Sequence, residues 1–270
     1  MDPGSEDRLG AAFRVHQAHT DEVMKQADPR EIKKLYVELG SLLEGALGDE
    51  PEGTPVLSFK EIGPAIEPLL RSLGRRVLDA GCGPNPAYSI LTARQAPRTV
   101  VSLDIAEGIV RLAVDVARSH GVVVHGVVGD LEALPFRDGA FDGCVCEDTI
   151  EHIPDDALAI RELDRVLTNG GRLVLGTPNR IRADVLRARL RDAVRRTRKP
   201  ASAYFEASSH LREYTWRTLT RLIASDFDVR RRVTIGWTGG WRSALVTRLV
   251  RHWPLKAFGR MVILDLEKRS

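Results

Sequence analysis

The chain has 270 residues, of which 43% are hydrophobic and 29% are charged. Its 40 basic and 37 acidic residues leave a formal net charge of +3. This small net charge excludes a strongly basic protein that binds a polyanion through its overall charge. No apolar run reaches the ~20 residues of a membrane span, and we expect no secretory signal. We expect Cys82, Cys144 and Cys146 to be reduced, with core positions for the Cys144–Cys146 pair, as suits a cytoplasmic protein.

The first periodic segment covers residues 11–48 and predicts helices. Apolar residues recur there at the spacing of one helix face: Ile32, Leu35, Leu39, Leu42 and Leu43. A second helix is predicted at 62–73, so we assign a helical cap to residues 1–73 and the main domain to residues 74–270. Three residues of this cap are candidates for covering a binding pocket: Tyr36, Phe59 and Lys60.

A short apolar strand follows at residues 75–80 and ends in a carboxylate and a glycine turn. Gly81 and Gly83 allow the backbone to bend sharply and allow a ligand to approach it closely. Asp79 stands at the carboxyl end of the strand, where open α/β sheets bind their ligands. A carboxylate in this place would repel a pyrophosphate, so the turn predicts a ligand that carries positive charge.

Further strands alternate with helices, which predicts a parallel sheet. They are expected at 99–104, 122–128, 141–147, within 163–179, at 226–235 and at 260–268. Two of them lead into aspartates, Asp104 at the end of its strand and Asp130 shortly after the next. Asp79 or Asp130 alone would more often be a helix cap than a ligand contact.

Taken in this order, the segments resemble the class I S-adenosylmethionine (SAM)-dependent methyltransferases, whose first motif matches residues 77–83. The resemblance covers roughly residues 60–180. It implies a Rossmann-like, doubly wound α/β fold with seven strands, mostly parallel, and an antiparallel last strand. N-terminal helices, a basic insertion at 180–212 and a helical insertion at 236–259 would complete this architecture.

The same resemblance implies a site for SAM, which carries an ammonium and a sulfonium group. Asp104 would accept hydrogen bonds from the two ribose hydroxyls, and Asp130 from the adenine amino group. The full set of expected cofactor contacts is Asp79, Gly81, Cys82, Gly83, Asp104, Ile105, Asp130, Leu131 and Glu147.

Candidate catalytic residues follow the fourth strand, where the methyl group would face its acceptor. Glu151 and His152 lie there, and His210 returns later in a segment that resembles one of the family. A neutral imidazole, with an ordinary pKa near ~6.5, could take a proton from an acceptor hydroxyl.

A divalent metal is the alternative role for this group, although our main expectation is that the site holds none. Ubiquinone-pathway O-methyltransferases and small-RNA 2′-O-methyltransferases resemble the chain at Glu151, His152 and His210, and there such residues bind a metal. The chain departs from that pattern at Asp148, where glutamate is usual. The Glu-His pair also occurs in metal-free relatives, where it is structural.

Two basic segments, 180–200 and 237–256, combine arginines with apolar residues or tryptophans. This composition suits peripheral contact with an anionic lipid surface, and a solvated lid is the alternative. No base-stacking array or known RNA module is evident, so we expect no nucleic-acid partner.

The sequence therefore predicts a SAM-dependent methyltransferase that methylates a hydroxyl of a small molecule with an apolar portion. A natural product, a quinone-like lipid or a glycolipid would fit. The alternatives are an RNA ribose 2′-O-methyltransferase and a non-catalytic SAM-binding regulator. We expect a cytoplasmic protein, and peripheral membrane association through the two basic segments is an alternative that the sequence leaves open. The acceptor and the oligomeric state are open as well.

Overall fold

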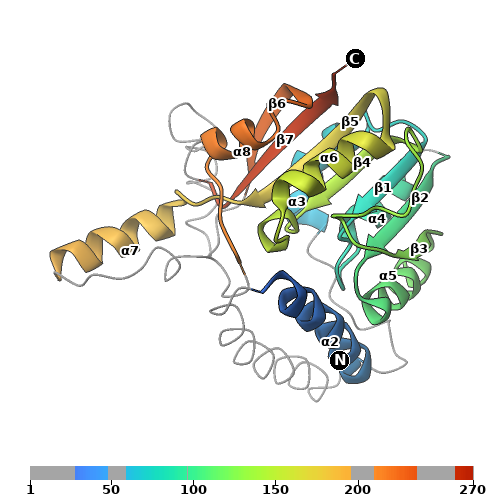
Figure 1. Cartoon of the computed structure of the whole chain (residues 1–270), viewed down its shortest axis with the longest axis horizontal. Helices are drawn as coiled ribbons and strands as arrows, with labels where there is room; N and C mark the ends of the chain where they lie inside the picture. The colour runs from blue at the N-terminus through green and yellow to red at the C-terminus, as the bar shows by residue number, and fades with distance from the viewer. Residues whose placement is uncertain (1–27, 48–58, 96, 196–209, 236–258, 270) are drawn as a thin grey trace.

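The computed structural model of the chain describes residues 28–47, 59–95, 97–195, 210–235 and 259–269. These residues form one seven-stranded sheet with helices on both faces, and the strand order is β3-β2-β1-β4-β5-β7-β6 (Figure 1). The strands are β1 (Arg76–Ala80), β2 (Thr99–Asp104), β3 (His125–Val128), β4 (Phe141–Glu147), β5 (Leu167–Pro178), β6 (Phe227–Ile235) and β7 (Met261–Lys268). The helices are α2 (Pro29–Leu47), α3 (Phe59–Leu70), α4 (Ala87–Ala93), α5 (Glu107–Ser119), the 3₁₀ turn η2 (Ile150–His152), α6 (Asp156–Val166), α7 (Ala183–Val194) and α8 (Trp216–Leu222).

Strand directions confirm the predicted fold class. β1 to β5 pair in parallel, whereas β7 runs antiparallel to both β5 and β6. One predicted strand is too long: residues 122–124 precede β3 because α5 ends at a turn through Gly121, which has a φ of 73°. The Val122 amide completes that turn by donating to the Ala117 carbonyl, so this valine serves the helix end instead of the sheet.

Both faces of the central strands are buried, which explains their nearly continuous apolar sequences. Leu78 and the Cys144–Cys146 pair belong to the cluster that packs under α6 and α8. Val77 and Val145 face the opposite side and pack against α3. The two cysteines of the pair therefore share one face as core residues, as predicted, and their thiols are free.

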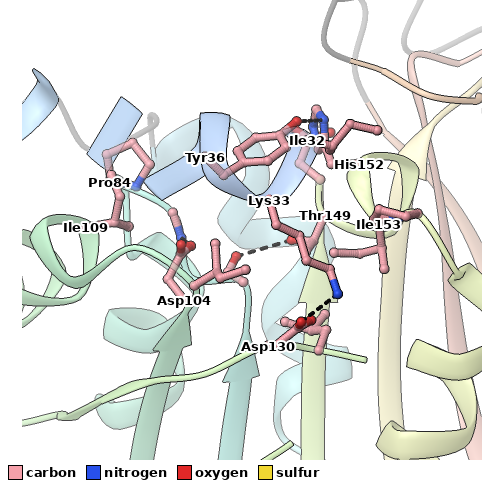
Figure 2. Close-up of a pocket in the computed structure, with 16 residues that line it drawn as sticks. Ile32, Lys33, Tyr36, Pro84, Asp104, Ile109, Asp130, Thr149, His152 and Ile153 are labelled. Carbon is pink, nitrogen blue, oxygen red and sulfur yellow. Dashed lines mark hydrogen bonds and ion pairs between the residues drawn. The ribbon is translucent and has the colours of Figure 1, made fainter. Parts of the chain in front are cut away.

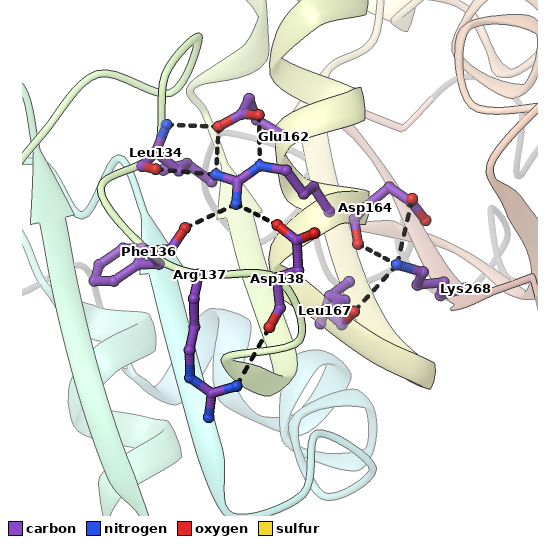
Figure 3. Close-up of polar contacts among 9 residues, drawn as sticks. Leu134, Phe136, Arg137, Asp138, Glu162, Asp164, Leu167 and Lys268 are labelled. Carbon is purple, nitrogen blue, oxygen red and sulfur yellow. Dashed lines mark hydrogen bonds and ion pairs between the residues drawn. The ribbon is translucent and has the colours of Figure 1, made fainter.

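A polar network holds the segment after β3 against α6 (Figure 3). Arg165 donates to the carbonyls of Leu134 and Phe136 at 3.0 and 2.8 Å and to Asp138 Oδ1 at 2.8 Å. Glu162 accepts from the Leu134 amide at 2.8 Å and from Arg165. These contacts fix a segment that has no regular secondary structure, and the same segment carries Asp130 at its beginning.

The chain reverses its winding direction between β1 and β4, because β2 and β3 extend the sheet one way and β4 and β5 the other. Ligands of open α/β sheets bind outside the carboxyl ends of the strands at such a point. Helix α2 lies at this end of the sheet beside α5 (Figure 1). Within the described ranges, no helix combines the length and hydrophobicity that a membrane span requires.

Candidate functional site

A cavity lies between α2 and the carboxyl ends of β1, β2 and β4 (Figure 2). Most of its wall comes from the loops that follow these strands, and α2 supplies the cover. The lining residues are Ile32, Lys33, Tyr36, Gly81, Gly83, Pro84, Asp104, Ile105, Ile109, Asp130, Leu131, Asp148, Thr149, His152, Ile153 and Pro154.

The glycine turn after β1 forms the floor of the cavity. Gly81 and Gly83 both have positive φ, 81° and 59°. A Cβ atom on Gly81 would lie 2.3 Å from the Thr149 side chain, so this position excludes any larger residue without a shift. Gly83 has open space where its Cβ would be, which leaves the backbone accessible to a ligand.

Of the three aspartates that line the cavity, Asp104 and Asp130 follow neighbouring strands, as the sequence predicts (Figure 2). Asp104 accepts from the amides of Gly83 and Ala106 at 3.2 and 3.1 Å, and burial raises the pKa of this carboxyl. Asp130 Oδ2 accepts from Lys33 Nζ at 2.6 Å. Helix α2 is thereby connected directly to the carboxylate that we expect to bind the adenine amino group.

Three of the expected cofactor contacts lie outside the cavity lining. Asp79 is 4% exposed and lies behind the turn, where Ser89 Oγ donates to its Oδ2 at 2.5 Å. Cys82 packs into the α5 interface because the turn directs its side chain away from the cavity. Glu147 ends β4, whereas Asp148 and Thr149 are the residues after this strand that reach the lining.

Burial raises the pKa of Asp79 to about 6, and the nearby Asp104 charge acts in the same direction against the Ser89 hydrogen bonds. The carboxyl of Asp79, which lies behind the glycine turn, is therefore harder to ionise than an exposed aspartate. A cationic group on the other side of the turn would favour its charged form.

The two predicted histidines come together beside the cavity. The ring centroids of His152 and His210 lie 4.8 Å apart in an edge-to-face arrangement. The Tyr36 hydroxyl of α2 lies 2.6 Å from His152 Nδ1. On the other side, His210 Nδ1 lies 3.3 Å from Glu213 Oε1, and Glu213 Oε2 accepts from Arg182 at 2.9 Å.

Glu151 lies close to both histidines. It is fully buried, and burial together with the neighbouring Asp148 charge raises the pKa of its carboxyl well above the ordinary value. Its Oε2 accepts from Thr177 at 2.9 Å, whereas Oε1 is buried without a hydrogen-bond partner among the described residues.

One possible ligand atom from each of Glu151, His152 and His210 lies within 4.8 Å of the others. A carboxylate and two imidazoles form a donor set that suits a divalent transition metal, and the unpartnered Oε1 leaves one ligand position open. These residues therefore fit the metal that the resemblance offered as an alternative. Asp148 has a φ of 50° and lines the cavity, but it does not belong to this group.

Comparisons with known proteins agree with this geometry. Residues 78–175 match the family described as "Methyltransferase domain". Residues 78–175 therefore form a methyltransferase domain of the class I fold. The domain shares its fold with a SAM-dependent methyltransferase from Aquifex aeolicus, whose structure aligns with a TM-score of 0.52 at 18% identity and covers 89% of this chain and 98% of the other.

Two relatives resemble this methyltransferase domain in sequence. Methyltransferase GfsG from Streptomyces halstedii is 30% identical over 171 residues, which cover 58% of this chain and 61% of the relative. A ubiquinone biosynthesis O-methyltransferase from Xanthomonas oryzae pv. oryzae is 39% identical over 112 residues, covering 40% and 44%. The chain thus spans about half the length of the curated relatives it matches.

Sequence reasoning missed several residues of the site. Tyr36 was a predicted cover residue and does line the cavity, whereas Lys33 was not predicted. Lys33 precedes Tyr36 by three residues, so helical spacing could have placed it on the same side of α2. Glu213 carries a weaker signal, its position three residues after His210. Arg182 has none, because its partner lies 31 residues away in sequence. The side chains of Phe59 and Lys60 and the segment 237–256 lie outside the residues that the structure describes.

Proposed function

We propose that this protein transfers a methyl group from SAM to a hydroxyl of a small molecule with an apolar portion. The supporting observation is the position of His152, which lines the cavity and contacts His210 and Tyr36. SAM, when bound, supplies an activated methyl group, so the protein needs to position an acceptor and remove its proton.

For the donor, the lining carboxylates Asp104 and Asp130 have the expected chemistry. We propose that Asp104 accepts from the ribose hydroxyls and that Asp130 accepts from the adenine amino group, in place of or together with Lys33. The accessible backbone at Gly83 would hold the amino-acid part, where the negative potential of Asp79 favours an ammonium group.

For the acceptor, we propose His152 as the general base. Tyr36 can donate or accept at Nδ1, so its hydroxyl is compatible with both the neutral and the protonated imidazole. The apolar residues Ile32, Ile153 and Pro154 line the same cavity and would contact the apolar portion of the acceptor. The O-methyltransferases among the relatives support an oxygen atom as the acceptor.

A divalent metal is a second candidate for activating the acceptor, favoured by the unpartnered Oε1 of Glu151. Glu151, His152 and His210 would hold it. Such an ion would lower the pKa of a coordinated hydroxyl. Turnover that survives chelation would exclude this candidate and leave the base mechanism in place.

The deciding experiment is an acceptor screen with isotopically labelled SAM, read by mass spectrometry. The panel holds natural products, quinone-like lipids, glycolipids and a short RNA. Methyl transfer to a hydroxylated small molecule, lost in His152→Ala with SAM affinity retained, would support the proposal. Transfer to RNA ribose would support the alternative enzyme, and SAM binding without transfer to any acceptor would favour a regulatory SAM-binding protein.

A further inference from the structure

Glu213 and His210 form a buried pair at the edge of the site. Their side chains are 1% and 5% exposed, and the His210 Nδ1 to Glu213 Oε1 distance is 3.3 Å. Neither residue lines the cavity, so Glu213 would act through His210 and not on a substrate.

The second oxygen of Glu213 is also engaged. Arg182 precedes α7 and is 5% exposed, and its Nη1 donates to Glu213 Oε2 at 2.9 Å. A guanidinium donates and never accepts, so this contact requires an acceptor at the Oε2 position.

From these contacts we infer that Glu213 is a positioning residue that fixes the tautomer of His210. A carboxylate can only accept, so Nδ1 of His210 carries the proton and Nε2 keeps its lone pair. That lone pair is available to His152 and Glu151, the other members of the cluster. The consequence for methyl transfer rests on the proposed function. His210 needs this lone pair either to accept a proton from His152 or to bind a metal ion.

The isosteric change Glu213→Gln tests the inference. Arg182 holds the amide oxygen at the Oε2 position, so the amide nitrogen must face His210 and donate to Nδ1. We expect the His210 tautomer to invert, with the proton on Nε2. The measurement is ¹⁵N NMR of the labelled full-length protein without SAM or acceptor, with His210 assigned by its loss in His210→Gln.

The double variant Glu213→Gln with Arg182→Met provides the matched control. Without the guanidinium the amide is free to rotate, so we expect the original tautomer to be regained in part. Thermal melting and SAM binding verify that each variant folds. A wild-type His210 with its proton on Nε2 or on both nitrogens would overturn the inference, as would an unchanged tautomer in folded Glu213→Gln. Because this readout needs no turnover, it stands even if methyl transfer is not observed.

A second, independent observation concerns α7, which extends away from the sheet (Figure 1). Three apolar side chains are exposed at spacings of four residues: Leu186 at 44%, Leu190 at 59% and Val194 at 84%. Arginines follow each of them by one residue at 187, 191 and 195, and these are exposed too. The helix therefore carries an apolar stripe and a parallel basic stripe.

We propose that this double-striped face of α7 docks on an anionic lipid surface. The apolar stripe is short and lies beside cations on the same exposed side, whereas Val185 and Asp192 are buried on the other. An anionic bilayer offers phosphates for the arginines and acyl chains for the adjacent stripe. Three arginines near such a surface would strengthen binding on the order of a hundredfold.

Co-sedimentation of the full chain with phosphatidylcholine vesicles, with and without phosphatidylserine, tests this proposal. We expect binding that needs phosphatidylserine, weakens with salt and falls at least ~10-fold in Leu190→Glu. Val123→Ser, which alters an exposed apolar residue before β3, is the matched control and should bind normally. No binding to anionic vesicles would overturn the proposal, and so would self-association in sedimentation velocity that Leu190→Glu abolishes without affecting vesicle binding.

Discussion

Replacement of Asp79 by asparagine should make the ligand-free protein more stable at neutral pH. The Asp79 pKa is about 6 in the folded protein against an ordinary value of 3.8, because burial opposes its charge. Each pKa unit corresponds to 1.36 kcal/mol, so keeping this carboxylate ionised in the folded state costs roughly 3 kcal/mol.

The pH dependence separates this cost from every other effect of the substitution. A raised folded pKa means that the folded state binds the proton more tightly than the unfolded chain does. The stabilising contribution of the protonated Asp79 is therefore present near pH 4 and is lost as pH rises through 6. Changes in packing or in the hydrogen bond from Ser89 are independent of pH in the asparagine variant.

Urea denaturation of the wild type and Asp79→Asn at pH 4, 5, 6 and 7 measures the difference. The advantage of the variant should grow by about 2.4 kcal/mol from pH 4 to pH 7 and then level off, because a small part of the full effect is already present at pH 4. The exposed Asp115→Asn serves as the control and should show no comparable trend. A difference between wild type and Asp79→Asn that stays flat over this range would refute the account of the buried charge. The same substitution should weaken SAM binding at pH 7, as titration calorimetry would show.

Three further substitutions test contacts that stabilise the helices, strands and loops outside the cavity. Thr215→Ala removes the side chain that caps α8 by accepting from the Thr218 amide, so urea denaturation should show a loss of about 1 kcal/mol, and an unchanged midpoint would contradict the capping role. Gly143→Ala would place a Cβ atom 2.3 Å from the Leu73 carbonyl oxygen, so we expect a loss of about 1–3 kcal/mol in thermal unfolding, whereas Gly170→Ala, whose Cβ has open space but a φ of 71°, should lose less. Arg165→Met removes the donors that hold the carbonyls of Leu134 and Phe136, so we expect faster hydrogen exchange at residues 134–138, and unchanged protection there would show that the segment is held by other contacts.

The order of the motifs made the fold predictable. Acids near the end of β1, at the end of β2 and shortly after β3 can lie at one edge of a sheet only if the strands are parallel, and these strands do pair in parallel. Long-range side-chain partners were not predictable in this way. Cys82 is part of the first motif, yet the positive φ values of the glycines on either side direct it toward α5. The contacts of Lys33 with Asp130 and of Arg182 with Glu213 depend on how α2 and the residues before α7 are placed on the sheet, which no local pattern specifies.

One part of the cavity lining lies inside the segment that the family match covers, and another part lies before it in the sequence. The family match begins at residue 78, so Gly81, Asp104 and Asp130 lie within the matched segment. Ile32, Lys33 and Tyr36 lie well before that boundary, yet they close the same cavity. Substitutions in α2 can therefore reshape one wall of the cavity without altering the segment that the family match covers.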